Sequence, residues 1–315
     1  MRDSASIGRA RRALFGRRPS GEGRAHAASD GGESKGLRFL GHAARLVTAC
    51  ADRRLVGSAI GDYRLARLLG QGRYGSCFEA ERIAFQGDSL AVPAPCRVAM
   101  KLVKPRKGRI DRQAVWAECG ALSLLDRAGV PRWLGIEQAV VRGEEPRYFI
   151  VETLCGGDCL SRLLKSGYVF SDGDIARIGS GLIDLVLHAA SRGVVHGDIR
   201  PANVLVDAGG SVSLVDFGLA RFYDRTRDGR ECLAASSPDI EGVAETILFM
   251  LYSDARRLRD DARRHGTWRD ELHLDEEREA FLADAFFAPE AFGTMEGFRG
   301  RFEDAFGFAR PIRQA

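Results

Sequence analysis

Two carboxylates and an amide stand close together in the second half of the chain, on stretches that read as loops. Asp198 and Asn203 are five residues apart in HGDIRPANVLV, and Asp216 follows in LVDFGLA, 18 residues beyond Asp198. Carboxylate and amide oxygens suit Mg²⁺ that carries substrate phosphates, and one of the two carboxylates would be left to accept a proton. The spacing therefore predicts metal-assisted chemistry on a phosphoryl group.

A glycine triad lies far upstream of these residues. Gly70, Gly72 and Gly75 occur in LLGQGRYGSCFEA, between two strand-like runs. Glycines let the backbone approach a phosphate and present its N–H donors to it. Such a triad is weak alone, because in most sequences it is a turn. A dinucleotide-binding fold would need a helix where this chain has a strand-like run, which argues against that fold.

One lysine and one glutamate complete the candidate chemistry. Lys101 lies in the strand-like run VAMKLV and is one of five lysines, whereas Lys and Arg together number 47. An ammonium is a compact point charge that can reach phosphate oxygens in a pocket, although a solvent-facing lysine on an edge strand is the simpler interpretation. Glu118 lies in a helical pattern and could reach Lys101. Such an ion pair adds little stability, so the role of Glu118 would be to hold the Lys101 side chain in position.

The elements that must position these residues form two groups. Strand-like runs begin at Tyr63 (YRLARLLG, SCFEAERIA, CRVAMKLV and RYFIVETL), interrupted by one helix-like stretch at 111–129. Helices are expected afterwards, roughly at 172–192, 238–252, 275–286 and 295–306. NVLVD and VSLVD, joined by AGG, predict a β-hairpin. The predicted fold class is α+β: a small β-rich lobe with one main helix, then a larger helical lobe.

Composition is that of an ordinary globular protein, with 45% hydrophobic and 29% charged residues. The longest apolar run, VAETILFMLY, is too short to span a membrane and carries Glu245, so we expect no transmembrane segment. The seven cysteines are scattered and odd in number, which predicts free thiols in a reducing compartment and hence a cytoplasmic location.

The basic charge is concentrated at the N-terminus. Residues 1–60 carry 12 Lys and Arg against 5 Asp and Glu, so the remaining residues carry 35 against 38. We expect a disordered basic tail at 1–36 and a helix or linker at 37–60. The tail is interpreted as a solvated segment, with contact to an anionic surface as the alternative. A nucleic-acid role is disfavoured because the tail lacks interleaved aromatic residues.

Taken together and in this order, the motifs resemble those of a eukaryotic-type protein kinase domain of the serine/threonine type, from about Tyr63 to Tyr252 and more faintly to Phe308. The resemblance implies a domain at 61–315, with an N-lobe at about 61–152 and a C-lobe at about 156–315. It implies ATP and Mg²⁺ as cofactors and a protein substrate that is not identified.

Carried over position by position, the resemblance assigns roles to the candidate residues. The catalytic group would be Asp198, which accepts or orients the substrate hydroxyl proton, with Lys101, Arg200 and Glu118; Asn203 and Asp216 would hold Mg²⁺. The ATP surface would comprise Gly70, Gln71, Gly72, Gly75, Cys77, Ala99, Lys101, Glu152, Leu154, Asp158 and Leu205. Phe217 would pack near Leu122 and His196, and Asp239 would anchor the loop that carries Asp198.

Two positions and one shortened segment depart from the family pattern. Gly197 replaces the arginine that clamps a phosphorylated activation loop, so such switching is not expected. Arg200 replaces a lysine, and its guanidinium can still neutralise the γ-phosphate. Gly218 and Asp239 are separated by only 20 residues, with no Ala-Pro-Glu motif. That shortening puts peptide docking in doubt.

Three functions remain open on these residues. The leading one is an ATP- and Mg²⁺-dependent transfer of phosphate to serine or threonine hydroxyls of protein. A kinase-like phosphotransferase acting on a small molecule or glycolipid is the second. The third is a pseudokinase or scaffold that keeps the fold without the chemistry.

Overall fold

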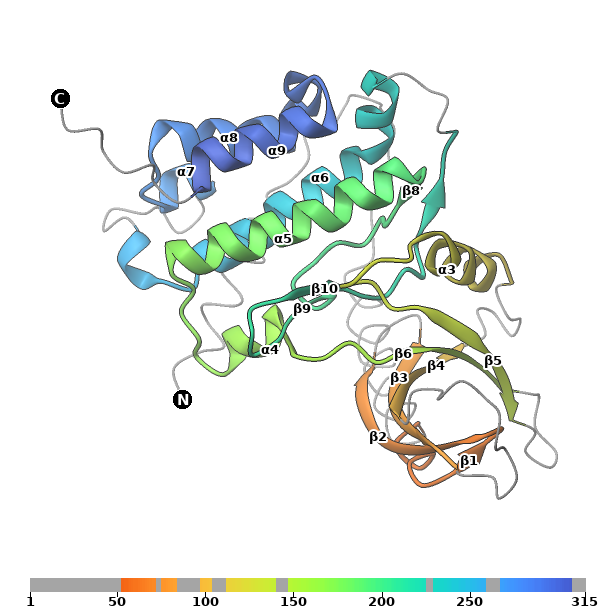
Figure 1. Ribbon diagram of the computed structural model, residues 1–315. Helices are drawn as coiled ribbons and strands as arrows, with labels where there is room; N and C mark the ends of the chain where they lie inside the picture. Colours follow the sequence, from red (N-terminus) through yellow and green to blue (C-terminus); the bar gives the residue numbers. More distant parts are fainter. Residues whose placement is uncertain are drawn as a thin grey trace, which may run out of the picture. The chain divides into compact units, whose positions relative to one another are not determined.

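The computed structural model describes residues 52–71, 75–83, 97–103, 112–139, 147–224, 229–258 and 267–307. The expected tail at 1–36, most of the expected segment at 37–60, and Gly72 lie outside these described residues. The chain divides into two compact units, drawn in Figure 1. Arg18–Arg112 and Trp133–Leu154 belong to the smaller unit, whereas Gln113–Arg132 and Cys155–Ala315 belong to the larger one. No helix in the described part of the chain is long and apolar enough to cross a membrane.

The smaller unit is an antiparallel sheet with the strand order β1-β2-β3-β4-β6-β5. Its strands are β1 (Ala59–Ile60), β2 (Tyr63–Gln71), β3 (Gly75–Arg82), β4 (Arg97–Val103), β5 (Trp133–Ala139) and β6 (Arg147–Thr153). Leu65, Phe78, Met100 and Phe149 are fully buried and form the centre of its core. Burial of these side chains is the main force that holds the strands together.

The larger unit is mainly helical, with short strands on its loops. Its helices are α3 (Arg112–Leu124), α4 (Leu160–Lys165), α5 (Asp172–Ser191), α6 (Gly229–Leu251), η1 (Ala255–Arg257), α7 (Trp268–Glu271), α8 (Glu276–Phe287), η2 (Pro289–Phe292) and α9 (Met295–Phe306). Its strands are β7 (Asp158–Cys159), β8 (Val194–Val195), β9 (Val204–Val206), β10 (Val212–Leu214) and β11 (Arg221–Phe222). The predicted hairpin is confirmed, because β9 and β10 pair antiparallel.

Helix α5 lies alongside α6 in this unit (Figure 1). It begins with a capping box, in which the Ser171 side chain accepts from the Asp174 N–H and the Asp174 side chain accepts from the Ser171 N–H. Its apolar face is buried in the core, including Ile178, Leu182 and Val186. The cap satisfies N–H groups that have no partner inside the helix, and burial of the apolar face stabilises the rest.

Helix α6 differs from the sequence-based expectation at its start. The predicted start at residue 238 is wrong, because the helix begins at Gly229 and continues through Pro238. A proline is usually read as a first-turn residue, since it has no N–H to donate. Here the preceding turns bury Leu233 in the core of the larger unit, and that packing outweighs the backbone bond lost at the proline.

Helix α3 packs within the larger unit. Ala121, Leu122 and Leu125 belong to its core. The backbone at Gly120 comes close to Phe222, since a Cβ added there would lie 3.2 Å from the ring. The sequence interpretation grouped this helix with the strands because it lies among them in the chain, whereas its own buried face contacts the helical unit.

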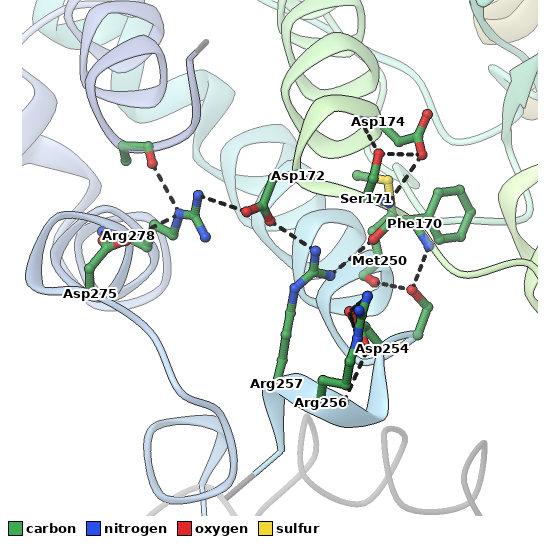
Figure 2. Close-up of polar contacts among 12 residues, drawn as sticks. Phe170, Ser171, Asp172, Asp174, Met250, Asp254, Arg256, Arg257, Asp275 and Arg278 are labelled. Carbon is green, nitrogen blue, oxygen red and sulfur yellow. Dashed lines mark hydrogen bonds and ion pairs between the residues drawn. The ribbon is translucent and has the colours of Figure 1, made fainter. Parts of the chain in front are cut away.

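A charged network joins the start of α5 to the segment that follows α6 (Figure 2). Arg257 donates to the Phe170 carbonyl at 3.0 Å and to Asp172 at 2.8 Å, and Arg278 lies 3.5 Å from the other oxygen of Asp172. The Arg257 side chain is only 15% exposed. Its neighbour Arg256 is 87% exposed and contacts Asp254.

We expect Arg257→Ala to lower the free energy of unfolding by about 1–2 kcal/mol, because the variant loses two hydrogen bonds of a largely buried guanidinium and leaves the Phe170 carbonyl without that donor. Arg256→Ala is the matched control and should change stability little, since an exposed local ion pair contributes little. Urea denaturation of both variants measures the difference. Equal stability of the two variants would contradict the structural role of the network.

Candidate active site

The loop at 196–203 is held between short strands of the larger unit. It follows β8 and leads into β9, and its Pro201 carbonyl accepts from the Ser161 N–H at 3.0 Å. The Asn203 N–H donates to the Arg200 carbonyl at 2.8 Å, which closes a turn inside the loop. The Asn203 carbonyl in turn accepts from Val215 at 3.0 Å. These backbone bonds connect the loop directly to the segment that carries Asp216.

Asp239 of α6 fixes the first residues of this loop. Its two carboxylate oxygens each accept one backbone N–H at 2.7 Å, from His196 and from Gly197. Asp239 is 1% exposed, and burial raises the pKa of its carboxyl to about 6. The two N–H donors and the charge of Arg221 act in the opposite direction. The predicted anchoring role of Asp239 is confirmed.

Gly197 has a conformation that explains its departure from the family pattern. Its φ is +76°, in the left-handed region, and a Cβ added there would lie 2.8 Å from the Leu219 carbonyl oxygen. A side chain at this position would therefore be strained and crowded. The loop is arranged around a glycine, so an arginine could not occupy this backbone as it stands.

Helix α6 also approaches the same loop closely, at a glycine. A Cβ added at Gly242 would lie 2.7 Å from both the Cβ and the carbonyl oxygen of Ile199. The sequence interpretation missed this contact. An isolated glycine within a helical pattern was the available signal, because such a residue often marks a close approach of another backbone.

Three predicted site residues come together on the loop. Asn203 donates through Nδ2 to the Asp198 carbonyl at 2.9 Å and to its Oδ2 at 3.1 Å. Arg200 Nε lies 3.2 Å from the same Oδ2. Asn203 is 4% exposed, whereas the Asp198 side chain is 26% exposed. The carboxylate is therefore oriented from inside the protein and remains accessible from outside.

Asp216 follows β10 in an unusual backbone conformation. It has φ +71° and is the sole non-glycine residue with positive φ among those that the structure describes. Such a conformation is costly and is often retained where a side chain must be aimed. The adjoining Phe217 is buried and packs edge-on against His196, with ring centroids 4.5 Å apart. His196 Nε2 lies 3.2 Å from the Val215 carbonyl oxygen.

The remaining predicted residues of the larger unit occupy neighbouring elements. Glu118 on α3 is 3% exposed. Asp158 pairs with Arg162 at 2.8 Å, and β7 pairs with β9, which places Leu205 opposite Cys159. Leu205 and Asp158 thus lie on one small sheet, and its strand β9 directly follows the 196–203 loop.

In the smaller unit the sheet register brings the other predicted residues together. Gly70 is opposite Cys77, and Cys77 is opposite Lys101, so the three form one row across β2, β3 and β4. Ala99 lies two residues from Lys101 on β4 and is opposite Glu152 on β6. Residues two apart on a strand share a face, and so do directly opposed residues.

Gly75 begins β3, Gln71 ends β2, and Leu154 follows β6. Gly75 approaches β4 closely, since an added Cβ would lie 2.5 Å from the Leu102 carbonyl oxygen. Cys77, Ala99 and Lys101 therefore share one face beside the glycine-rich turn. The predicted pairing of Lys101 with Glu118 joins residues of the two units and stays a prediction.

Comparison with known proteins gives consistent matches. The family model described as a protein kinase domain matches residues 63–237. CBL-interacting protein kinase 4 of Oryza sativa subsp. japonica is 29% identical over 57% of this chain and 38% of its own length. CBL-interacting protein kinase 22 of the same plant is 31% identical over 62% and 45%, respectively.

A bacterial relative is matched over a larger share of its length. The probable serine/threonine-protein kinase YbdM of Bacillus subtilis is 24% identical over 68% of this chain and 78% of its own length. The chain spans less than half of the length of the two plant relatives.

Proposed function

The chain belongs to the protein kinase domain family, and on that premise we propose that it transfers the γ-phosphate of ATP, bound with Mg²⁺, to serine or threonine hydroxyls of protein. The relatives named above are described as kinases. The proposed proton acceptor, Asp198, and one proposed Mg²⁺ ligand, Asn203, lie on the same loop. The observation that carries the proposal is the contact of Asn203 and Arg200 with the Asp198 carboxylate.

In the proposed reaction Asp198 orients the acceptor hydroxyl and takes its proton. Asn203 and Arg200 hold the carboxylate through Oδ2, so its orientation is fixed before a substrate arrives. Asn203 would use its remaining amide oxygen, and Asp216 its carboxylate, to hold Mg²⁺, which supplies charge neutralisation at the phosphates. Arg200 would neutralise the γ-phosphate.

The residues of the smaller unit would bind the nucleotide. Lys101 would contact the phosphates and Glu118 would hold Lys101. The backbone of the glycine-rich turn would cover the phosphates, with Cys77 and Ala99 against adenine. The connector that includes Glu152 and Leu154 would hydrogen-bond adenine through its backbone, and Asp158 would lie near the ribose. A lysine and two small apolar side chains on one sheet face support this assignment.

A small-molecule acceptor is the second candidate, and the start of α6 favours it. Residues 219–228 alone separate Gly218 from Gly229, where the helix begins. In the family this segment forms the shelf for a peptide, so its shortening leaves less chain to bind one. A dedicated protein partner with its own docking surface could also bind without this peptide shelf.

We propose the cellular compartment from the cysteines and the charge of the chain. None of the described cysteines forms a disulfide, which fits a reducing compartment such as the cytoplasm. For the basic residues before the domain, the leading proposal is a solvated segment, and contact with an anionic surface is the alternative. The domain itself would extend over 61–315.

We expect Mg²⁺ and ATP together to raise the unfolding midpoint of the full chain, because a ligand that binds the folded state stabilises it. Asp216→Ala should abolish the Mg²⁺-dependent part of this increase. Asp207→Ala is the matched control, since Asp207 is an exposed aspartate on the β9–β10 turn. Thermal unfolding with ATP, with and without Mg²⁺, measures the effect.

Two outcomes would overturn parts of the proposal. No Mg²⁺-dependent response in the unaltered chain would favour a scaffold over an enzyme. A full response in Asp216→Ala would remove the metal assignment. Incubation with labelled ATP, generic proteins and candidate sugars tests the acceptor, with Asp216→Ala as the blank. Label that enters only a sugar would replace the protein-kinase assignment with the second candidate.

A further inference from the structure

Asp52 lies ahead of the region matched by the family model and is nevertheless buried. It precedes β1, and the match begins at residue 63. Only 4% of Asp52 is exposed. Its Oδ2 accepts from Ser76 Oγ at 2.5 Å and from Gln71 Nε2 at 2.7 Å. A buried carboxylate is costly unless donors compensate it, and these two do so.

The two donors stand at a particular place in the sheet. Gln71 and Ser76 face each other as the last pair of the β2–β3 ladder, immediately before the glycine-rich turn. A single carboxylate oxygen therefore joins the two stems of that turn. Both stems lose freedom to separate or slide, because each is tied to the same atom.

The carboxylate lies on the face of the sheet away from the proposed nucleotide contacts. Successive residues of a strand point to opposite faces, so Ser76 and Cys77 point in opposite directions. Lys101 is opposite Cys77 and shares its face. Asp52 therefore reaches the stems from the other side, where a negative charge does not face the phosphates.

Asp52 is itself held by the smaller unit. The Leu55 N–H donates to the Asp52 carbonyl at 3.0 Å, which forms a turn. The Leu55 side chain packs against the core of the unit. The Gly57 N–H then donates to the Leu65 carbonyl on β2 at 2.7 Å. The carboxylate is thus fixed to the sheet that it braces.

We propose that Asp52 is a positioning residue for phosphate binding: it fixes the separation of the strand ends at Gln71 and Ser76, and the nucleotide phosphates would bind beside those ends, on the face that carries Lys101. This inference rests on the proposed use of ATP. The segment ahead of the kinase domain is then a working part of the nucleotide site. Loss of the Asp52 carboxylate should weaken binding more for ligands with more phosphates, and it should leave the binding of adenosine unchanged.

The test is calorimetric binding of ATP with Mg²⁺, and separately of adenosine, to the full chain. Asp52→Ala should weaken ATP binding about 10-fold, the consequence of losing one to two charge-assisted hydrogen bonds, while adenosine binding stays within about twofold. Asp52→Asn keeps one acceptor oxygen and should recover most of the ATP affinity. Asp62→Ala, a less buried aspartate of the same unit, is the matched control and should change neither affinity.

Ser76→Ala provides a second, milder variant that removes one donor and keeps the carboxylate. It should weaken ATP binding about threefold without affecting adenosine. Unchanged ATP binding in Ser76→Ala, or in folded Asp52→Ala, would overturn the inference. So would a loss of ATP and adenosine affinity in equal proportion, because a general structural defect predicts that result. If the unaltered chain binds neither ligand, the proposed function itself fails, which is a separate outcome.

Discussion

We expect Asp198→Asn to lower the turnover number about 10²- to 10⁴-fold, while ATP affinity changes by less than about threefold. An amide cannot take the proton of an acceptor hydroxyl. In the unaltered chain, Asn203 Nδ2 donates to Oδ2 of the carboxylate and Arg200 Nε forms an ion pair with the same oxygen. The asparagine carries no negative charge, so it loses this ion pair. The nucleotide contacts proposed for the smaller unit are unaffected by this change.

Steady-state phosphate transfer and calorimetric ATP binding measure the two quantities. Asp207→Asn, on the exposed β9–β10 turn, is the matched control and should retain full turnover because its side chain can still accept the Ser211 N–H. If Asp198→Asn transfers phosphate as fast as the unaltered chain, the assignment of the proton acceptor is wrong. If both turnover and ATP affinity collapse together, the residue serves the fold and not the reaction.

The second large effect is expected for Asp239→Asn, which should lower turnover about 10- to 100-fold at pH 7.5. The carboxylate accepts from two backbone N–H groups, whereas an amide has one oxygen and must direct its NH₂ group at the other donor. The loop would shift at His196 or Gly197, and Asp198 would move with it. Glu241→Gln, exposed on the same helix, is the control.

The same residue predicts a pH dependence with opposite signs for stability and activity. Because the pKa of Asp239 is raised from 3.8 to about 6 on folding, the folded state holds the proton more tightly. Its contribution to stability, of order 3 kcal/mol, is complete below about pH 4 and is lost as the pH rises through about 6. Activity should follow the ionised form, which accepts both N–H groups, and should fall as the pH drops through about 6.

Urea denaturation and turnover measured from pH 4 to pH 7.5 separate these two effects. The stability of the unaltered chain relative to Asp239→Asn should decrease across this interval, because the asparagine does not titrate. The acid limb of the activity profile near pH 6 should disappear in the variant. A constant stability difference across the interval would show that Asp239 has the same pKa in the folded and unfolded chain.

The residue types and their spacing predicted much of the candidate site, for physical reasons. The interval from Asp198 to Asn203 spans one tight loop, and the run into β9 and β10 is a hairpin signal, so local sequence determines how these residues meet. The row of Gly70, Cys77 and Lys101 follows from the antiparallel pairing of three strands that are consecutive in the chain.

Contacts between distant segments were harder to predict. The start of α6 at Gly229 depends on tertiary burial of Leu233. Pro238 in the sequence instead indicates a helix that begins near that proline. The close approach of Gly242 to Ile199 joins residues from a helix and a loop that no local pattern connects. The hydrogen bond from Ser76 to Asp52 spans 24 residues and involves a segment that the sequence predicts only as a helix or linker.

The backbone at Gly197 bears on how the proposed activity could be controlled. In kinases that carry an arginine there, a phosphate added to a nearby loop draws the machinery into order, and its removal silences the enzyme. Here the N–H of Gly197 is already bound to Asp239 within the bare polypeptide. Under the proposed function, a phosphate on a nearby loop would therefore meet no arginine side chain at position 197, and treatment with a phosphatase should leave the contacts of this loop unchanged.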